Sequence, residues 1–168
     1  MSHNFNKLSI YVTPSIMERN TRKDIEQFLE CRTIVVAGAS RKAKSFSASV
    51  ILHLESIGYN ILSVNPNFSE NSLERNEYKS MTDLPEGVNN LLVLTSPLQT
   101  ASVMKQAMEK GIGNIWIQQK SDTPEALEIG KQAGINLISN QCIFMFTQPD
   151  GIHKFHYGMK KLFRTIPV

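Results

Sequence analysis

Short apolar runs alternate along this chain with longer stretches in which apolar residues recur every three or four positions. The strand-like runs span Thr33 to Gly38, Tyr59 to Val64, Leu91 to Thr95, Asn114 to Gln118 and Ile135 to Ile138. The first run is apolar on both faces, which is typical of an inner strand in a covered parallel sheet. The alternation predicts an α/β fold with a doubly wound sheet of five parallel strands in the order 3-2-1-4-5, joined by right-handed crossovers.

Capping residues mark where the helices between these runs begin and end. The predicted helices run from Thr13 to about Cys31, from Ser45 to Ser56, from Ser96 to Gly111 and from Thr123 to Gly134. Proline follows the capping residue in three of them, as expected at a first helical position. The polar stretch from Asn65 to Asp83 is expected to be a long loop, and the tail from Gln148 to Val168 a helical extension. We therefore expect one domain over residues 1–168, with its core at about 33–142.

Composition and charge narrow the class of protein. Hydrophobic residues make up 41% of the chain and charged residues 20%, and the net charge of +3 is too mild to predict a nucleic-acid partner. No apolar run approaches the roughly 20 residues of a membrane span, and residues 1–10 lack the apolar segment of a secretory signal. Cys31 and Cys142 are the only cysteines and form no CxxC pair. We expect a cytoplasmic protein with free thiols and no membrane partner.

The loop after the first strand is the first candidate for a binding site. Open parallel sheets bind ligands beyond the carboxyl ends of their strands, at the point where the strand order reverses. Gly38 allows a tight turn and close approach of a phosphate, and the next helix directs its N-terminal amides to the same place. Ala39 is a further candidate contact, and hydroxyls and cations that suit a phosphorylated ligand follow it in this loop: Ser40, Arg41, Lys42, Lys44 and Ser45. The alternative is an ordinary glycine turn with exposed basic residues.

The ends of the other strands are expected to complete this crevice. They are polar or small, and the candidate ligand contacts among them are Asn65, Pro66, Ser96, Pro97, Gln118 and Cys142. An NAD-dependent enzyme commonly has an acidic residue at the end of the second strand to hold the ribose hydroxyls. Asn65 occupies that position here, which counts against NAD and permits a phosphate nearby.

With these segments in register, the chain resembles the small, free-standing bacterial members of the CoA-binding domain family. These are Rossmann-like domains related to the CoA-binding domain of the succinyl-CoA synthetase alpha subunit. The resemblance is carried by Val36-Ala-Gly-Ala-Ser40, Gly58-Tyr59, Val64-Asn-Pro66, Leu84-Pro85, Ser96-Pro97, Gly111, Trp116-Ile-Gln118, Gly134 and Cys142. It implies that Gly38, Ser40, Arg41 and Lys42 contact the CoA phosphates. It also implies that Asn65-Pro66 and Ser96-Pro97 flank the adenosine and that Gln118 lines the site.

Two departures from the family pattern fall at the site itself. Many free-standing members carry prolines and a glycine-aromatic pair after Ala-Ser, where this chain reads Arg-Lys-Ala-Lys-Ser-Phe. Around the cysteine they often read Asp-Arg-Cys-Pro, where this chain has Asn140-Gln-Cys-Ile143. The positive charge of the first loop is preserved. The family's adenine and pantetheine contacts are not carried over.

The residues favour a binding protein over an enzyme. The synthetases use a phosphorylated histidine from a second domain that this chain lacks, and no nucleophile elbow, Walker loop or HExxH motif occurs. His53 is expected to pack within a helix, and the pair His153 and His156 lacks further metal ligands. Cys142 is expected to be a small buried residue, with a mixed disulfide to CoA as the alternative.

Three functions therefore stay open at this point. The first is a CoA or acyl-CoA carrier, sensor or regulatory module. The second is an NADP-linked oxidoreductase or redox sensor, because the basic loop could hold a 2′-phosphate. The third is an interaction domain whose C-terminal helix docks a partner through Lys154, Phe155, Lys160, Lys161 and Phe163. Exposed edge strands and the aromatic tail are compatible with a homodimer.

Overall fold

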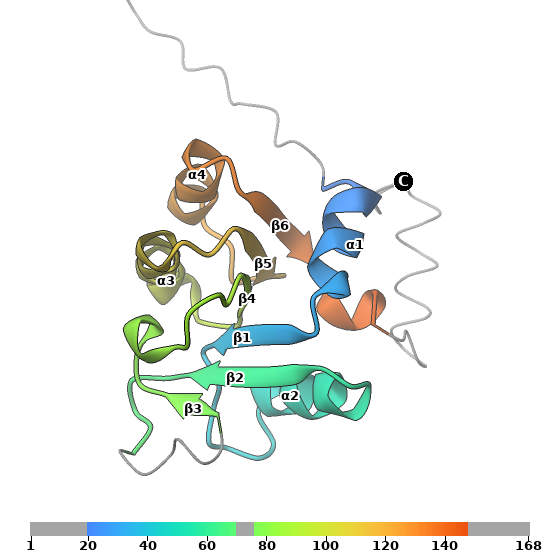
Figure 1. The fold of residues 1–168 in the computed structure, drawn as a ribbon, viewed down its shortest axis with the longest axis vertical. Coiled ribbons are helices and arrows are strands. Elements are labelled where there is room, and N and C mark those ends of the chain that lie inside the picture. The colour runs from blue at the N-terminus through green and yellow to red at the C-terminus, as the bar shows by residue number, and fades with distance from the viewer. Residues whose placement is uncertain (1–19, 70–75, 148–168) are drawn as a thin grey trace, which may run out of the picture.

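The sheet consists of six parallel strands. In the computed structural model, residues 20–69 and 76–147 are described. The strand order is β3-β2-β1-β4-β5-β6, and every neighbouring pair runs parallel (Figure 1). The strands are β1 (Thr33–Ala37), β2 (Asn60–Val64), β3 (Glu77–Tyr78), β4 (Asn90–Val93), β5 (Asn114–Gln118) and β6 (Asn136–Gln141).

Three of the four helices in the described residues begin at side-chain caps that the sequence supplies. They are α1 (Arg22–Glu30), α2 (Phe46–Ser56), α3 (Pro97–Lys110) and α4 (Pro124–Gln132), with short 3-10 turns η2 (Met81–Asp83) and η3 (Ile143–Met145). The Ser45 hydroxyl accepts a hydrogen bond from the Ala48 amide (3.1 Å), and the Thr123 hydroxyl accepts one from the Ala126 amide (3.2 Å). Each cap satisfies an amide that would otherwise have no partner at the start of its helix.

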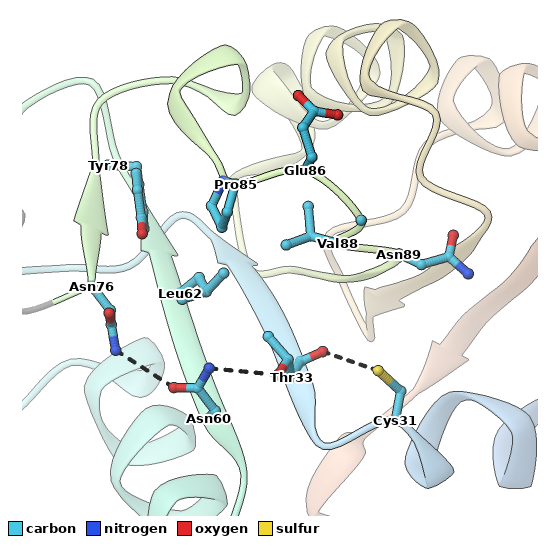
Figure 2. A pocket seen from close by; sticks show the side chains of 11 residues that line it. Cys31, Thr33, Asn60, Leu62, Asn76, Tyr78, Pro85, Glu86, Val88 and Asn89 are labelled. Atoms are coloured by element: carbon cyan, nitrogen blue, oxygen red, sulfur yellow. Dashed lines mark hydrogen bonds between the residues drawn. The ribbon is translucent and has the colours of Figure 1, made fainter.

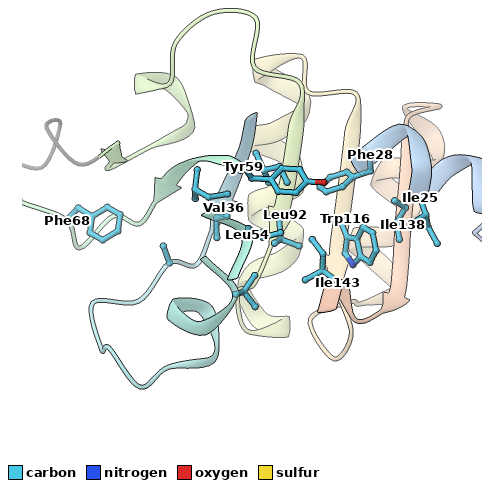
Figure 3. Packing of buried hydrophobic residues seen from close by; sticks show 14 residues of the cluster. Ile25, Phe28, Val36, Leu54, Tyr59, Phe68, Leu92, Trp116, Ile138 and Ile143 are labelled. Carbon is cyan, nitrogen blue, oxygen red and sulfur yellow. The ribbon is translucent and has the colours of Figure 1, made fainter. Parts of the chain in front are cut away.

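Helices cover both faces of the sheet, so its inner strands are buried on each side. On one face, α1, α2 and η3 pack around Trp116, whose ring meets Phe28 edge-on at a centroid distance of 5.5 Å (Figure 3). On the other face, α3, α4 and η2 pack around Leu91, Val93 and their neighbours. This two-sided burial explains why β1, β4 and β5 read as continuous apolar runs rather than as alternating ones.

The doubly wound, Rossmann-like architecture is confirmed, with one strand more than the five expected. The observed order contains the same sequence of numbers as the predicted order 3-2-1-4-5, but the numbers 3, 4 and 5 now refer to other segments of the chain. The strand expected at the edge, from Leu91 to Thr95, is β4 and pairs with β1. The edge position beside β2 belongs to β3, which lies within the predicted loop from Asn65 to Asp83. A strand of only two residues is too short to show an alternation of apolar and polar positions, so β3 is recognised only by its pairing with β2.

The predicted first helix also differs from the structure. A helix from Thr13 to Cys31 was expected, whereas α1 begins at Arg22 behind the extended residue Thr21. Thr21 and Asp24 form a reciprocal capping box, and this pair of hydrogen bonds marks the start of α1. Thr13, Pro14 and the predicted C-terminal extension lie outside the described residues.

The two edge strands of the sheet, β3 and β6, offer little free backbone to another strand. At one edge, β3 offers only two residues. At the other edge, the side chain of Asn20 bonds the backbone of Ser139 in β6, donating to its carbonyl (2.7 Å) and accepting from its amide (3.2 Å). Asn20 thus occupies the hydrogen-bonding groups that a neighbouring strand would use at this point.

Candidate functional site

The strand order reverses between β1 and β4, and the candidate site lies at the carboxyl ends of these strands. From β1 the chain passes to β2 on one side, and it later returns to place β4 on the other side (Figure 1). The sequence had placed this reversal beside the strand from Asn114 to Gln118, which was wrong. The correction brings Thr95, Ser96 and Pro97 next to the loop that begins at Gly38, rather than two strands away.

Gly38 is required by the backbone just beyond the end of β4. Its φ is +89°, a value that L side chains rarely adopt, and a Cβ here would lie 2.8 Å from the Thr95 nitrogen and 2.9 Å from the Leu94 carbonyl carbon. Close approach of a phosphate at this glycine stays a prediction. In the structure, the nearest atoms to a Cβ at this position are main-chain atoms of Leu94 and Thr95, just beyond β4, so Gly38 sets how closely the two loops approach.

Serine hydroxyls shape the loop from within. The Ser40 amide donates to the Ser47 hydroxyl (3.0 Å), and the Ser40 hydroxyl accepts from the Lys42 amide (3.2 Å). The Ser45 hydroxyl caps α2. The hydroxyls predicted to contact a ligand are therefore already acceptors for backbone amides, and the Ser45 hydroxyl also shares a hydrogen bond with the Ser47 hydroxyl (3.3 Å).

Asn65 ties the end of β2 to this loop. Its amide nitrogen donates to the Ala39 carbonyl (2.6 Å), and its amide oxygen accepts from the Asn67 backbone (2.9 Å). Both ends of the side chain are thus used inside the protein. Pro66 is exposed beside it. The sequence identified both positions but not the clamp that Asn65 makes.

Cations gather at the same edge of the sheet. The Arg41 guanidinium lies over the Phe68 ring, 5.7 Å from its centroid, and Lys42 and Lys44 are exposed in the same loop. Lys120, which adopts φ +75°, is exposed just beyond β5. Among residues 20–69 and 76–147, no carboxylate forms an ion pair with any of these four side chains. Their charge is available to an anionic ligand.

The N-terminus of α3 forms the other side of the crevice. Ser96 precedes the helix without capping it, Pro97 occupies the first turn, and Leu98 is 96% exposed. Beneath them, the buried Thr100 hydroxyl bonds the Ser121 carbonyl (2.7 Å) and the Thr95 hydroxyl (3.1 Å). The N-termini of α2 and α3 therefore both point their positive dipole ends toward the carboxyl edge of β1 and β4.

The two remaining predicted contacts lie further along the edge. Gln118 is buried, and its side-chain oxygen accepts from the Ile143 amide (3.2 Å), which ties β5 to η3. Cys142 precedes η3 and is half-buried. Its neighbour Gln141 is buried, and its side-chain oxygen has no hydrogen-bond partner within the described structure. The structure thus groups the loop 38–45 with Asn65 and Ser96-Pro97, and sets Gln118 and Cys142 apart.

A hollow of about 400 Å³ lies at the opposite, amino edge of the sheet (Figure 2). Its lining is Cys31, Thr33, Asn60, Leu62, Asn76, Tyr78, Pro85, Glu86, Gly87, Val88 and Asn89. The one charged side chain in this lining, Glu86, pairs with Lys110 (3.0 Å). A lining with a carboxylate and no cation does not suit a phosphorylated ligand. This hollow could not be predicted from the sequence, because its walls are brought together by β3 and the loop before β4.

Two further features bear on other chemistry. His53 packs as expected, with its Nε2 atom 3.0 Å from the Thr147 hydroxyl and its ring beside Phe144. Within the part of the chain that the structure describes, no three histidine, cysteine or acidic side chains group as metal ligands, and no helix is long and apolar enough to cross a membrane. His153 and His156 lie outside the described residues.

Comparison with known proteins identifies the family of this chain. The family model described as CoA binding domain matches residues 32–148. The Bacillus subtilis protein YneT is 25% identical over 128 residues, which cover 76% of this chain and 94% of YneT.

Solved structures of similar proteins have the same fold. A hypothetical protein from Pyrococcus horikoshii superposes with a TM-score of 0.65 at 29% identity, covering 72% of this chain and 85% of that one. A Thermus thermophilus protein superposes with a TM-score of 0.65 at 26% identity, covering 80% and 96%. The family match spans the whole sheet and every candidate loop. This chain belongs to the CoA-binding domain family.

Proposed function

We propose that the protein binds coenzyme A or an acyl-CoA at the carboxyl edge of β1 and β4, as a non-catalytic carrier, sensor or regulatory module of the cytoplasm. The observation that carries the proposal is the convergence of two helix N-termini, at the reversal of the strand order, with cations that have no carboxylate partner in the described part of the chain. Such a place stabilises a diphosphate through backbone amides and charge together. The family match supports CoA in particular and gives no support to the NADP alternative.

In the proposed complex, the loop 38–45 holds the diphosphate. Backbone amides at the start of α2 donate to it, and Lys42 and Lys44 neutralise its charge. The adenosine lies between Pro66 and the Ser96-Pro97 turn, both of which are exposed. The pantetheine arm crosses the ends of β4 and β5 in this proposal, which brings the far end of the ligand to Gln118 and Cys142.

The test is the melting temperature of the purified protein with CoA, acetyl-CoA, NADP and NAD. A ligand present at a hundredfold excess over its Kd stabilises the native state by about 2.7 kcal/mol. CoA or acetyl-CoA is expected to raise the melting temperature, and NAD is not. A rise with NADP alone would replace the proposal with the NADP reading, and no rise with any nucleotide would favour the interaction domain.

A pair of double variants tests the location. Arg41→Ala with Lys42→Ala is expected to weaken CoA binding and to flatten its dependence on salt concentration. The matched control is Arg22→Ala with Lys23→Ala on α1, which removes the same two charges from a helix that packs against β5 and β6. Equal weakening by both double variants would show that only net charge matters.

A further inference from the structure

Arg41 is held in place although it lies on the surface. Its guanidinium rests over the ring of Phe68, and Phe68 is itself 5% exposed and part of the hydrophobic core. The turn that carries this ring is closed by a hydrogen bond from the Phe68 amide to the Asn65 carbonyl (3.0 Å). A cation over an aromatic face loses less conformational freedom on binding than a lysine that extends into solvent.

The backbone just before Arg41 is also fixed. The Asn65 side chain donates to the Ala39 carbonyl (2.6 Å), and the Ser47 hydroxyl accepts from the Ser40 amide of the same peptide group (3.0 Å). The guanidinium is therefore placed at the end of β2 by this held peptide and by its contact with Phe68.

The end of β2 is where a doubly wound domain holds the ribose of an adenine nucleotide. An acidic residue there bonds unmodified ribose hydroxyls, whereas an arginine nearby accommodates a phosphate on the ribose. Here the residue at this position, Asn65, uses both ends of its side chain within the protein. Arg41 is the cation beside it and has no carboxylate partner among the described residues.

We infer that Arg41, held over Phe68, reads a phosphate monoester on the ribose of the ligand and so sets the specificity of the site. This inference rests on the proposed function. Lys42, Lys44 and the helix amides serve the diphosphate, while the planar guanidinium offers paired N–H donors to the ribose phosphate. The shared chemistry is a ribose phosphate, carried at the 3′ position in CoA and at the 2′ position in NADP.

The test compares CoA with dephospho-CoA, which lacks this phosphate, by isothermal titration calorimetry. The wild-type protein is expected to bind CoA about ten- to a hundredfold more tightly. Arg41→Ala is expected to reduce CoA to the affinity of dephospho-CoA, while the affinity for dephospho-CoA changes less than about twofold. Arg41→Lys is expected to retain part of the preference, since it keeps the charge but not the paired donors. NADP and NAD form a second pair that distinguishes the 2′ from the 3′ source.

The matched control is Arg32→Ala at the amino edge of the sheet. Arg32 also lies over an aromatic ring, that of Tyr59, at 5.0 Å. Arg32→Ala removes one positive charge and one cation–ring contact, as Arg41→Ala does. It is expected to leave the preference for CoA over dephospho-CoA intact. Phe68→Leu, checked for folding by its melting curve, is expected to reduce the preference without abolishing CoA binding.

The outcomes separate the inference from the function on which it rests. If wild type binds CoA and dephospho-CoA equally, or if Arg41→Ala weakens both by the same factor, the ribose-phosphate role is wrong and CoA binding stands. If wild type binds neither compound but prefers NADP to NAD, the role of Arg41 stands and CoA is the wrong ligand. If no nucleotide binds, both fail.

Discussion

Gly38 and Thr95 approach so closely that the two loops of the crevice are in backbone contact. A Cβ on residue 38 would stand 2.8 Å from the Thr95 nitrogen, nearer than side chains pack in proteins. The relationship links the end of β1 to the end of β4 and leaves no space for a side chain between them. It also changes what a substitution at Gly38 is expected to do.

Gly38→Ala is expected to destabilise the fold by about 2–5 kcal/mol, combining a left-handed backbone with a steric clash. Gly58→Ala is the matched control, because Gly58 has φ +90° and open space around its Cβ position. It is expected to cost only about 1–2 kcal/mol. Urea unfolding of both variants measures the difference. Equal losses would mean that β4 moves aside without cost.

Thr100→Val is expected to cost about 1–3 kcal/mol, because the buried Ser121 carbonyl loses its donor and the Thr95 hydroxyl loses its acceptor. Valine has nearly the same shape, so the loss reports the hydroxyl. Thr82→Val, at an exposed threonine, is expected to stay within about 0.5 kcal/mol of wild type. Thermal unfolding checks both variants, and an unchanged Thr100→Val protein would show that water replaces the hydroxyl.

The two half-buried thiols lie at opposite edges of the sheet and can report where a ligand binds. Acetyl-CoA, which has no free thiol, is expected to slow alkylation of Cys142 by iodoacetamide and to leave Cys31 unaffected. Cys142 follows β6, two strands from β4 and so roughly 10 Å along the edge. Peptide mass spectrometry measures each rate. Protection of Cys31 instead would move the ligand to the hollow at the amino edge.

Tyr59→Phe tests a pH dependence. Burial raises the pKa of Tyr59, with the positive charge of Arg32 opposing and Cys31 adding to the effect. An unfolded tyrosine ionises near pH 10, so above about pH 10 the unfolded state releases a proton that the folded state keeps. The stability that the neutral phenol contributes is complete below pH 10 and falls as pH rises toward the raised pKa.

The measurement is urea unfolding of Tyr59→Phe and wild type from pH 8 to 11.5. At neutral pH the variant is expected to be less stable by about 1 kcal/mol, since it loses the bond from the Tyr59 hydroxyl to the Leu29 carbonyl (2.8 Å). Above pH 10 this deficit is expected to shrink. Stability curves that stay parallel over the whole range would contradict the pKa shift.

The sequence predicted the parts of the fold that long apolar runs and helix caps determine. Ser45, Ser96 and Thr123 all precede helices as expected, since the start of a helix is a local property of a few residues, and Ser45 and Thr123 also cap their helices with their side chains. It missed β3, whose pairing with Ser63 and Val64 comes from the tertiary fold. It also misplaced β4, because the residues of a strand do not determine which other strands it pairs with.

For the candidate site, residue types were predictable but their partners were not. Gly38, Arg41 and Asn65 were identified from their positions after strands. That Gly38 faces Thr95, that Asn65 clamps Ala39 and that Arg41 rests on Phe68 all depend on loops distant in sequence. These contacts decide which groups are free to meet a ligand, and they could not be derived from spacing.

The side chain of Asn20 at the margin of β6 bears on self-association. A second copy that joined there by continuing the ladder would have to displace two hydrogen bonds to Ser139. At the far margin, the two residues of β3 offer too little backbone to pair with a strand of another chain. Any homodimer is therefore expected to join through helix surfaces and not through a shared sheet. The same two features protect the protein against edge-to-edge aggregation.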